Sequence, residues 1–543
     1  MDSRHSRLFL CACVLAYGTT AQSQPNVPDL PLVDLVKQAK TAERSSAYDV
    51  AEQLFRRALA RLPNRPELTA VTLWNELGYI HQQEARLAEA TGDYQKALNI
   101  NLALEVPDEI ERATSIGNLA TIAITQGRFA EAEHELREAI TSLDHNRLLG
   151  STMGPVLLTN LAFVLRKERH FPEAAEAYRK AEDAVLHNSG QNSAEYARLL
   201  VGIGQLSFDS GNYSDAIEKG RHALEIENGL QAIDARSKAT VENNLGLTLG
   251  TVGQLPEAEL LLTRAVERYK SEHLLHDPGL IETLNNLATV RMRVGNLEGA
   301  QKSAQEAISL SSNSEGVGNS TLANVHNTLG ILAMRRGDQR TARTELGTAL
   351  AIWSKTAGPN SPEYCAVLTN LATLDDHSGH HKHAETLYRQ ALATDEAQLG
   401  PKDPRVAEDL ANIAAQLFRR KQMGEALRLY TRARSLQERT FGPNSPQVAT
   451  LWHSEGIVQR ASKHLDEASE AYGRAIAAFK ASTSADPQEF YSCLREYADL
   501  LRILQHFNEA EETDLLATRI QVTDTLHRQR NGGGDRKSTL TFR

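Results

Sequence analysis

Aromatic side chains are scarce in this sequence: Phe, Trp and Tyr make up 5% of its 543 residues, although 41% of the residues are hydrophobic. A core of that composition must be built mainly from Ala, Leu, Ile and Val, and small side chains favour helices that pack closely together. Basic residues are not in excess either, because the formal net charge is -10. A protein that binds nucleic acid or an anionic membrane mainly through its overall positive charge is therefore excluded.

Cysteines and long apolar runs are also few. Four cysteines, at positions 11, 13, 365 and 493, cannot form a disulfide framework for a chain of this length. The apolar run from Leu8 to Tyr17 is too short to span a bilayer, for which about 20 residues are needed. No other run reaches membrane length, so we expect no integral membrane insertion.

The N-terminal residues resemble an export signal. Arg4 and Arg7 precede the short apolar run, and small residues follow it at Gly18 to Ala21. We expect a signal peptide over residues 1–21, a linker over 22–29, and a mature protein that is periplasmic or secreted. Two alternatives remain: a buried first helix, and lipid attachment at Leu10-Cys11-Ala12-Cys13.

A repeat of 42 residues organises the rest of the chain. One column of eleven alanines recurs at this interval, and a second column of eleven alanines follows each of them by seven residues. A third column, twelve residues before the first, holds only Gly or Ala, so helices must meet there at short distance. The three columns begin at Gly78, Ala90 and Ala97 and end at Ala498, Ala510 and Ala517.

Each repeat is expected to be a helix hairpin. Gly127, Gly211, Gly253, Gly295, Gly337 and Gly379 stand where the first helix should end, because a left-handed residue commonly caps a helix C-terminus. Pro172 and Pro256 are expected in the first turn of the second helix. We therefore expect a partial N-terminal repeat over 30–62, eleven repeats over 67–519, and a C-terminal cap and disordered tail over 520–543.

The columns resemble the tetratricopeptide repeat (TPR), whose pattern is matched by Trp74, Leu77, Gly78, Ala90, Tyr94 and Ala97. Asn-Leu-Ala and Asn-Leu-Gly openings, together with loops such as Gly358-Pro359-Asn360-Ser361-Pro362, resemble the kinesin light chain variety. One departure is His81, which replaces a family Tyr. The resemblance implies an all-α solenoid, a right-handed superhelix of stacked antiparallel hairpins, that binds a protein or peptide in its concave groove.

Two rows of polar residues fall on the face of the first helix that should line this groove, at positions 6 and 13 when the small residue is counted as position 8. In kinesin light chain-like repeats, the resemblance implies that asparagines at position 6 hold the backbone of an extended peptide. The alternative is that they bond a neighbouring helix or loop. Cations at position 13 predict an acidic ligand, unless they only complement the helix dipole. The candidate peptide-binding residues are Asn118, Asn160, Asn244, Asn286, Asn370, Asn412, Lys167, Arg293, Arg335 and Arg419, and His377 also occupies position 13.

Catalytic or metal chemistry has one candidate, the histidine cluster His377, His380, His381 and His383 beside one turn. A metal would need their nitrogens to converge, usually with a carboxylate or Cys. Cys365 and Cys493 are interpreted as buried small side chains rather than nucleophiles.

We therefore expect an exported, non-enzymatic scaffold without cofactors, whose partner the sequence does not name. The competing hypotheses are a metal-binding or enzymatic protein that uses the histidine cluster, and a structural spacer in an envelope assembly.

Overall fold

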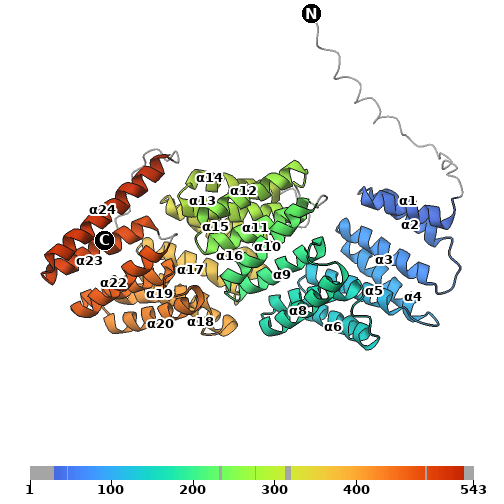
Figure 1. The fold of residues 1–543 in the computed structure, drawn as a ribbon, viewed down its shortest axis with the longest axis horizontal. Coiled ribbons are helices and arrows are strands. Elements are labelled where there is room, and N and C mark those ends of the chain that lie inside the picture. Colours follow the sequence, from blue (N-terminus) through green and yellow to red (C-terminus); the bar gives the residue numbers. More distant parts are fainter. Residues whose placement is uncertain are drawn as a thin grey trace, which may run out of the picture. The chain divides into compact units, whose positions relative to one another are not determined.

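Every regular element in the described part of the chain is a helix in this computed structural model (Figure 1). The structure describes residues 30–45, 47–230, 235–275, 277–311, 319–482 and 486–530. The expected signal peptide and linker, and the tail beyond residue 530, lie outside these ranges. The helices are α1 (Leu32–Arg44), α2 (Tyr48–Leu59), α3 (Leu68–Gln83), α4 (Leu87–Leu102), α5 (Glu109–Thr125), α6 (Phe129–His145), α7 (Met153–Lys167), α8 (Phe171–Asn188), α9 (Ala194–Asp209), α10 (Tyr213–Gly229), α11 (Ala235–Thr251), α12 (Leu255–Ser271), α13 (Pro278–Val294), α14 (Leu297–Ser311), α15 (Asn319–Arg335), α16 (Gln339–Thr356), α17 (Pro362–His377), α18 (His381–Leu399), α19 (Pro404–Arg419), α20 (Met423–Phe441), α21 (Pro446–Ala461), α22 (Leu465–Ala481), α23 (Pro487–Ile503) and α24 (Phe507–Arg530).

The chain divides into two compact units, Met1–Ile122 and Ala123–Arg543, with the boundary inside α5. In the first unit, α1 pairs with α2 and α3 pairs with α4, and α2 packs against α3. In the second unit, α7 to α24 form consecutive pairs, and the second helix of each pair also packs against the first helix of the next. This succession is the expected α-solenoid of stacked hairpins.

The small-residue columns explain how tightly the two helices of a hairpin meet. Gly78 lies so close to Tyr94 that an added Cβ would stand 2.5 Å from the ring. A Cβ added at Gly330 would likewise stand 2.7 Å from the side chain of Leu346. In both pairs the large residue occupies the same place in the second helix, so the first helix provides a notch for a large side chain of the second.

The two alanine columns form the centre of each hairpin. All 22 of these alanines are buried, with exposed fractions of 4% or less, and Ala265 and Ala349 are at 0%. Side chains of this size are required here because neighbouring helices leave no room for more. The expectation that these columns mark helix contacts is confirmed.

The turns within hairpins follow the expected chemistry. The six predicted glycines all have positive φ, between +73° and +89°. The other repeats place Ala85, Arg169, Lys421, Lys463 and Gln505 there, also with positive φ. Pro172 and Pro256 lie in the first turns of α8 and α12.

The loops between hairpins end in N-caps. Ser361, Asp403 and Ser445 accept hydrogen bonds from backbone N–H groups of α17, α19 and α21, and a proline follows each of them. At the other end of the solenoid, α24 continues through residues 520–530, past the last predicted repeat. Among the described residues, no helix combines the length and the apolarity needed to cross a bilayer.

Candidate functional site

The predicted amide row at position 6 lies on the first helices of the hairpins, and each of its side chains is half-buried. Asn118 belongs to the first unit, and the other five residues, Asn160, Asn244, Asn286, Asn370 and Asn412, belong to the second. The second unit therefore carries most of the candidate surface.

Two of these amides bond the preceding repeat. Asn286 donates to Oδ1 of Asn243 at 3.0 Å, and Asn370 donates to Oδ1 of Asn327 at 2.8 Å. Both acceptors stand at position 5 of the preceding first helix. At these two positions the side-chain NH₂ group therefore bonds a neighbouring helix, which was the alternative to holding a peptide backbone. Because an amide also carries an acceptor oxygen, the bond uses only part of its hydrogen-bonding capacity.

The cations at position 13 are exposed, and the three arginines make a recurring contact with the end of the preceding first helix. Arg293 donates to the carbonyl of Gly250, Arg335 donates to the carbonyl of Met292 at 3.1 Å, and Arg419 donates to the carboxylate of Asp376. Donor and acceptor are 43 residues apart in each case. A guanidinium has five N–H donors, so these contacts orient the group without exhausting it.

Several charged side chains on this helix face are desolvated although they are exposed. Lys167 and Arg293 are exposed, yet the pKa of each is lowered because the surrounding protein disfavours their charged forms. For Arg293 the charge of Arg335 acts in the same direction. Glu408 is exposed as well, and its pKa is raised by the same desolvation. The protein around these three side chains therefore disfavours their charged forms although the side chains reach solvent.

Acidic residues also line this surface, and the sequence analysis did not include them. Glu282 and Glu408 occupy position 2 of α13 and α19, which lies on the same helix face as positions 6 and 13. Glu282 and Glu363 both act electrostatically on Lys167, although they belong to α13 and α17 and Lys167 ends α7. This helix face therefore carries both signs of charge, and the glutamates at position 2 of two repeats were the sequence signal for it.

The four histidines of the predicted cluster do not converge on one point. His383 contacts Asp375 at 2.5 Å, and His381 contacts Asp376 at 2.7 Å, through their Nδ1 atoms. His377 Nδ1 contacts the carbonyl of Thr373, and His380 is 3.8 Å from Asp375. Desolvation would raise the pKa of both aspartates, but the pKa of each is lowered, for Asp375 mainly by the hydrogen bond from Arg343 and for Asp376 by hydrogen bonds from Gln416 and His381 and by the charge of Arg419. This arrangement does not favour the metal-binding alternative.

The two cysteines of the solenoid are buried, Cys365 at 1% exposure and Cys493 at 0%. Burial raises the pKa of Cys365 to about 12 and also raises that of Cys493. Because the thiolate is the nucleophile, such thiols are unreactive near neutral pH.

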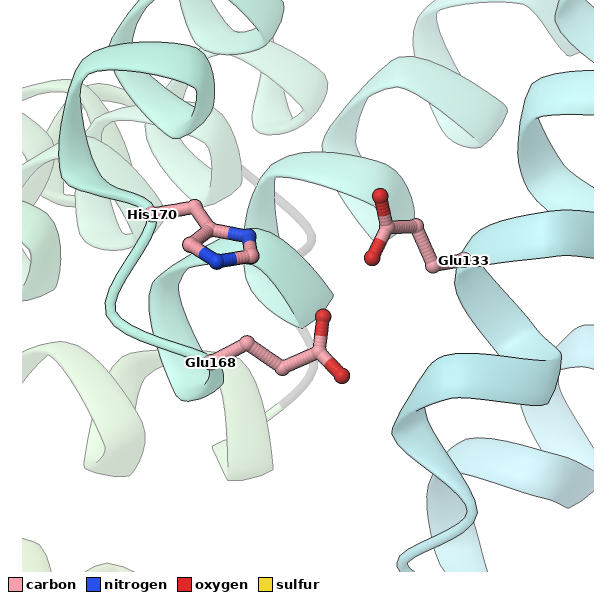
Figure 2. A group of neighbouring side chains, drawn as sticks. All are labelled: Glu133, Glu168 and His170. Carbon is pink, nitrogen blue, oxygen red and sulfur yellow. The ribbon is translucent and has the colours of Figure 1, made fainter.

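A different group converges in the described part of the chain: Glu133 of α6 with Glu168 and His170 of the α7–α8 turn (Figure 2). Their ligand atoms lie within 4.8 Å of one another. Burial and the neighbouring Glu133 raise the pKa of Glu168, so the two carboxyl groups are suited to share a proton. Arg137 donates to Glu133 at 2.8 Å, so its guanidinium already supplies a positive charge beside these carboxyl groups. We therefore assign it no cofactor.

Comparisons with known proteins agree with this architecture. A sequence profile described as tetratricopeptide repeat matches residues 68–144, 195–271, 321–397 and 406–481, and a second profile with the same description matches residues 159–229. A TPR repeat-containing protein of Dictyostelium discoideum is 24% identical over 184 residues, which are 33% of this chain but only 11% of that relative.

Two solved structures are also similar. A Rap protein complexed with Competence and Sporulation Factor has a TM-score of 0.51 and 13% identity, over 68% of this chain and 98% of that one. BtubC (BKLC) from P. vanneervenii has a TM-score of 0.35 and 20% identity, over 45% of this chain and 93% of that one. Because so few residues are identical, the likeness to the Rap protein shows the fold alone.

Proposed function

Because the chain belongs to the tetratricopeptide repeat family, we propose that it is an exported, non-enzymatic scaffold that binds a protein partner. The proposal of export rests on the basic and apolar N-terminal residues and the small residues that follow them. The proposal of a scaffold is supported by the repeats themselves, since stacked hairpins produce an extended concave surface suited to binding.

The partner segment is proposed to lie in an extended conformation along the first helices of the second unit. The observation that carries this proposal is the polar, solvent-exposed but partly desolvated face formed by positions 6 and 13. The half-buried amides offer acceptor oxygens to a ligand backbone. Exposed guanidinium groups at position 13 lie seven residues further along the helix axis, a rise of about 10 Å, and α13 and α19 carry both an asparagine and an arginine of these rows. An extended backbone has unpaired N–H groups that such acceptors satisfy.

The charges of the groove indicate the chemistry of the segment. Acidic groups of the ligand are placed at position 13, where Arg293, Arg335 and Arg419 present forked donors that match carboxylates. Glu282 and Glu408 at position 2 favour a basic group of the ligand near the N-terminal ends of the same helices. The proposed ligand is thus an extended segment with acidic groups, and with a basic group displaced from them.

The Rap protein supports ligand binding on this kind of fold, since it was solved with Competence and Sporulation Factor. At 13% identity the two chains share an architecture, and the ligand of the Rap protein is not assigned to this chain.

Site-specific cross-linking tests this function. A photoreactive amino acid at position 370, in the amide row, is compared with one at Lys302, which is exposed on α14 outside the groove. The chains are used to capture partners from an envelope or secreted extract of the native organism. We expect a specific adduct from position 370 and none from position 302. Adducts from position 302 alone, or no partner at either, would favour another surface or the spacer hypothesis.

A further inference from the structure

Two turns of the second unit contact segments that lie several hairpins further along the chain. Arg169, in the α7–α8 turn, donates to Oδ2 of Asp403, which precedes α19, at 2.7 Å. Tyr213, at the start of α10, stacks on Phe441, at the end of α20, with ring centroids 5.1 Å apart and planes 13° apart. Both contacts join the hairpins α7–α8 and α9–α10 to the hairpin α19–α20.

The two contacts form one patch. Burial raises the pKa of Tyr213, and the carboxylate of Asp403 raises it further, so the stacked ring lies within electrostatic range of the ion pair. Beside them, the turn glycine Gly211 approaches Thr440 so closely that an added Cβ would lie 3.2 Å from its methyl group. We call Arg169, Tyr213, Asp403 and Phe441 the clasp.

The ion pair of the clasp is preorganised. Oδ1 of Asp403 accepts the N–H of Arg405 at 2.9 Å and caps α19, which leaves Oδ2 directed to Arg169. Asp403 is 8% exposed and Arg169 is 33% exposed. Arg169 also adopts φ +65°, in a turn position where six other repeats have glycine. Four other repeats also place a non-glycine residue there with positive φ, so what distinguishes this turn is an arginine that faces Asp403.

The clasp closes the run of hairpins from α7 to α20 on itself, beside the groove. Lys167, two residues before Arg169, is within electrostatic range of Glu282 on α13 and Glu363 on α17. The end of α7 therefore faces the inner surface of the intervening repeats. The contact is made by side chains, and the helices of the two groups do not pack against each other as consecutive hairpins do. A contact of this kind is suited to open without unfolding a repeat.

We propose that the clasp is a reversible gate of the groove: closed, it restricts access to the inner face of α11–α17, and its opening admits a bulky partner. This proposal rests on the proposed function for the identity of what enters. The gate itself is testable without any partner, so its failure is distinguishable from failure of the scaffold proposal.

The first experiment measures the closed contact by electron spin resonance. Spin labels are attached at Ser214→Cys and Arg439→Cys, which are exposed positions on α10 and α20, in a full chain with Cys11 and Cys13 replaced by alanine. We expect a short, narrow distance distribution in this chain and a longer, broader one after Arg169→Glu with Phe441→Ala. The matched control, Arg179→Glu with Leu186→Ala, changes one exposed arginine and one exposed apolar residue on α8 and should leave the distribution unchanged.

The second experiment measures access to the groove with a maleimide-coupled polyethylene glycol and Arg293→Cys as the reactive site. Modification should be several-fold faster when the clasp is broken than in the control chain, while the circular dichroism spectra remain alike. A broad distribution before the clasp is mutated would overturn the proposal, as would equal distances or equal modification rates in the clasp and control variants.

Discussion

Arg419, at the end of α19, donates a hydrogen bond to Asp376, near the end of α17, one repeat earlier. Arg335 and Arg293 reach back in the same way to the carbonyls of Met292 and Gly250. The three arginines of position 13 therefore connect successive repeats. A ligand that binds them contacts groups whose positions depend on how the repeats stack.

Ala265→Glu is predicted to destabilise the solenoid severely. Ala265 is 0% exposed in the centre of the α11–α12 hairpin, so a glutamate would either bury an unpaired charge or separate the helices. We expect a loss of at least about 3 kcal/mol, concentrated in the mutated repeat and its neighbours. Hydrogen exchange read peptide by peptide measures this. Lys302→Glu, on the exposed face of α14, is the control, and protection around α12 equal to the control would refute the packing account.

Asp409→Asn is predicted to stabilise the hairpins α17–α20 at pH 8. Asp409 is 3% exposed, and burial raises its pKa to about 7, while the hydrogen bond from Thr369 opposes the shift and the charge of Asp395 adds to it. In the unfolded chain its pKa is near 4, so the contribution of Asp409 to stability is most favourable below about pH 4 and falls as the pH rises from about 4 to about 7. We expect this decline, of the order of 2–4 kcal/mol, to weaken in the variant. Urea unfolding at several pH values measures it, and parallel profiles would contradict it.

Glu52→Gln is predicted to have the opposite pH dependence in the first unit. Desolvation opposes ionisation of Glu52, but hydrogen bonds from Arg86 and Arg56, together with the buried His81, whose Nε2 is 3.3 Å from the carboxylate, lower its pKa to about 2. Its stabilising contribution is therefore complete above the ordinary value of 4.5 and is lost as the pH falls toward 2. We expect the variant to lose about 2–3 kcal/mol near pH 7 and to show a flatter acid limb. Equal stability of the variant and the native chain at pH 7 would be the contrary result.

Export is predicted to produce a mature chain that begins near Gln22. N-terminal sequencing of the protein from its native source checks this, and an intact Met1 chain recovered from the cytoplasm would reject the signal-peptide interpretation.

The local fold was predictable from sequence because the packing repeats at a constant interval along the chain. Ala265, Gly127 and Pro172 could be placed from their columns alone, since each occupies a site whose steric requirement recurs in the other repeats. The contact between Arg169 and Asp403 could not be predicted, because it depends on how the small rotations between repeats accumulate over several hairpins.

The candidate site was predictable only in part, for a related reason. The helix face that carries Asn286 and Arg293 follows from helical periodicity. The bond from Asn286 to Asn243 depends on the stagger of neighbouring hairpins, which the period does not reveal. His381 contacts Asp376 whereas His383 contacts Asp375, and this difference likewise depends on the backbone conformation of one turn.

The dissociation constant of the captured partner is the most direct test of groove binding. It is compared for the native chain, for Arg293→Gln, Arg335→Gln and Arg419→Gln combined, and for an outer-face control with the same change of charge, Arg179→Gln, Lys302→Gln and Arg389→Gln. A charged hydrogen bond contributes about 1.5–3 kcal/mol, so loss of even one predicts a dissociation constant at least about tenfold higher for the groove variant. The control should bind as the native chain does, and circular dichroism should show equal helicity in all three. Equal affinity of the groove variant and the control would contradict the assignment of the partner to the groove.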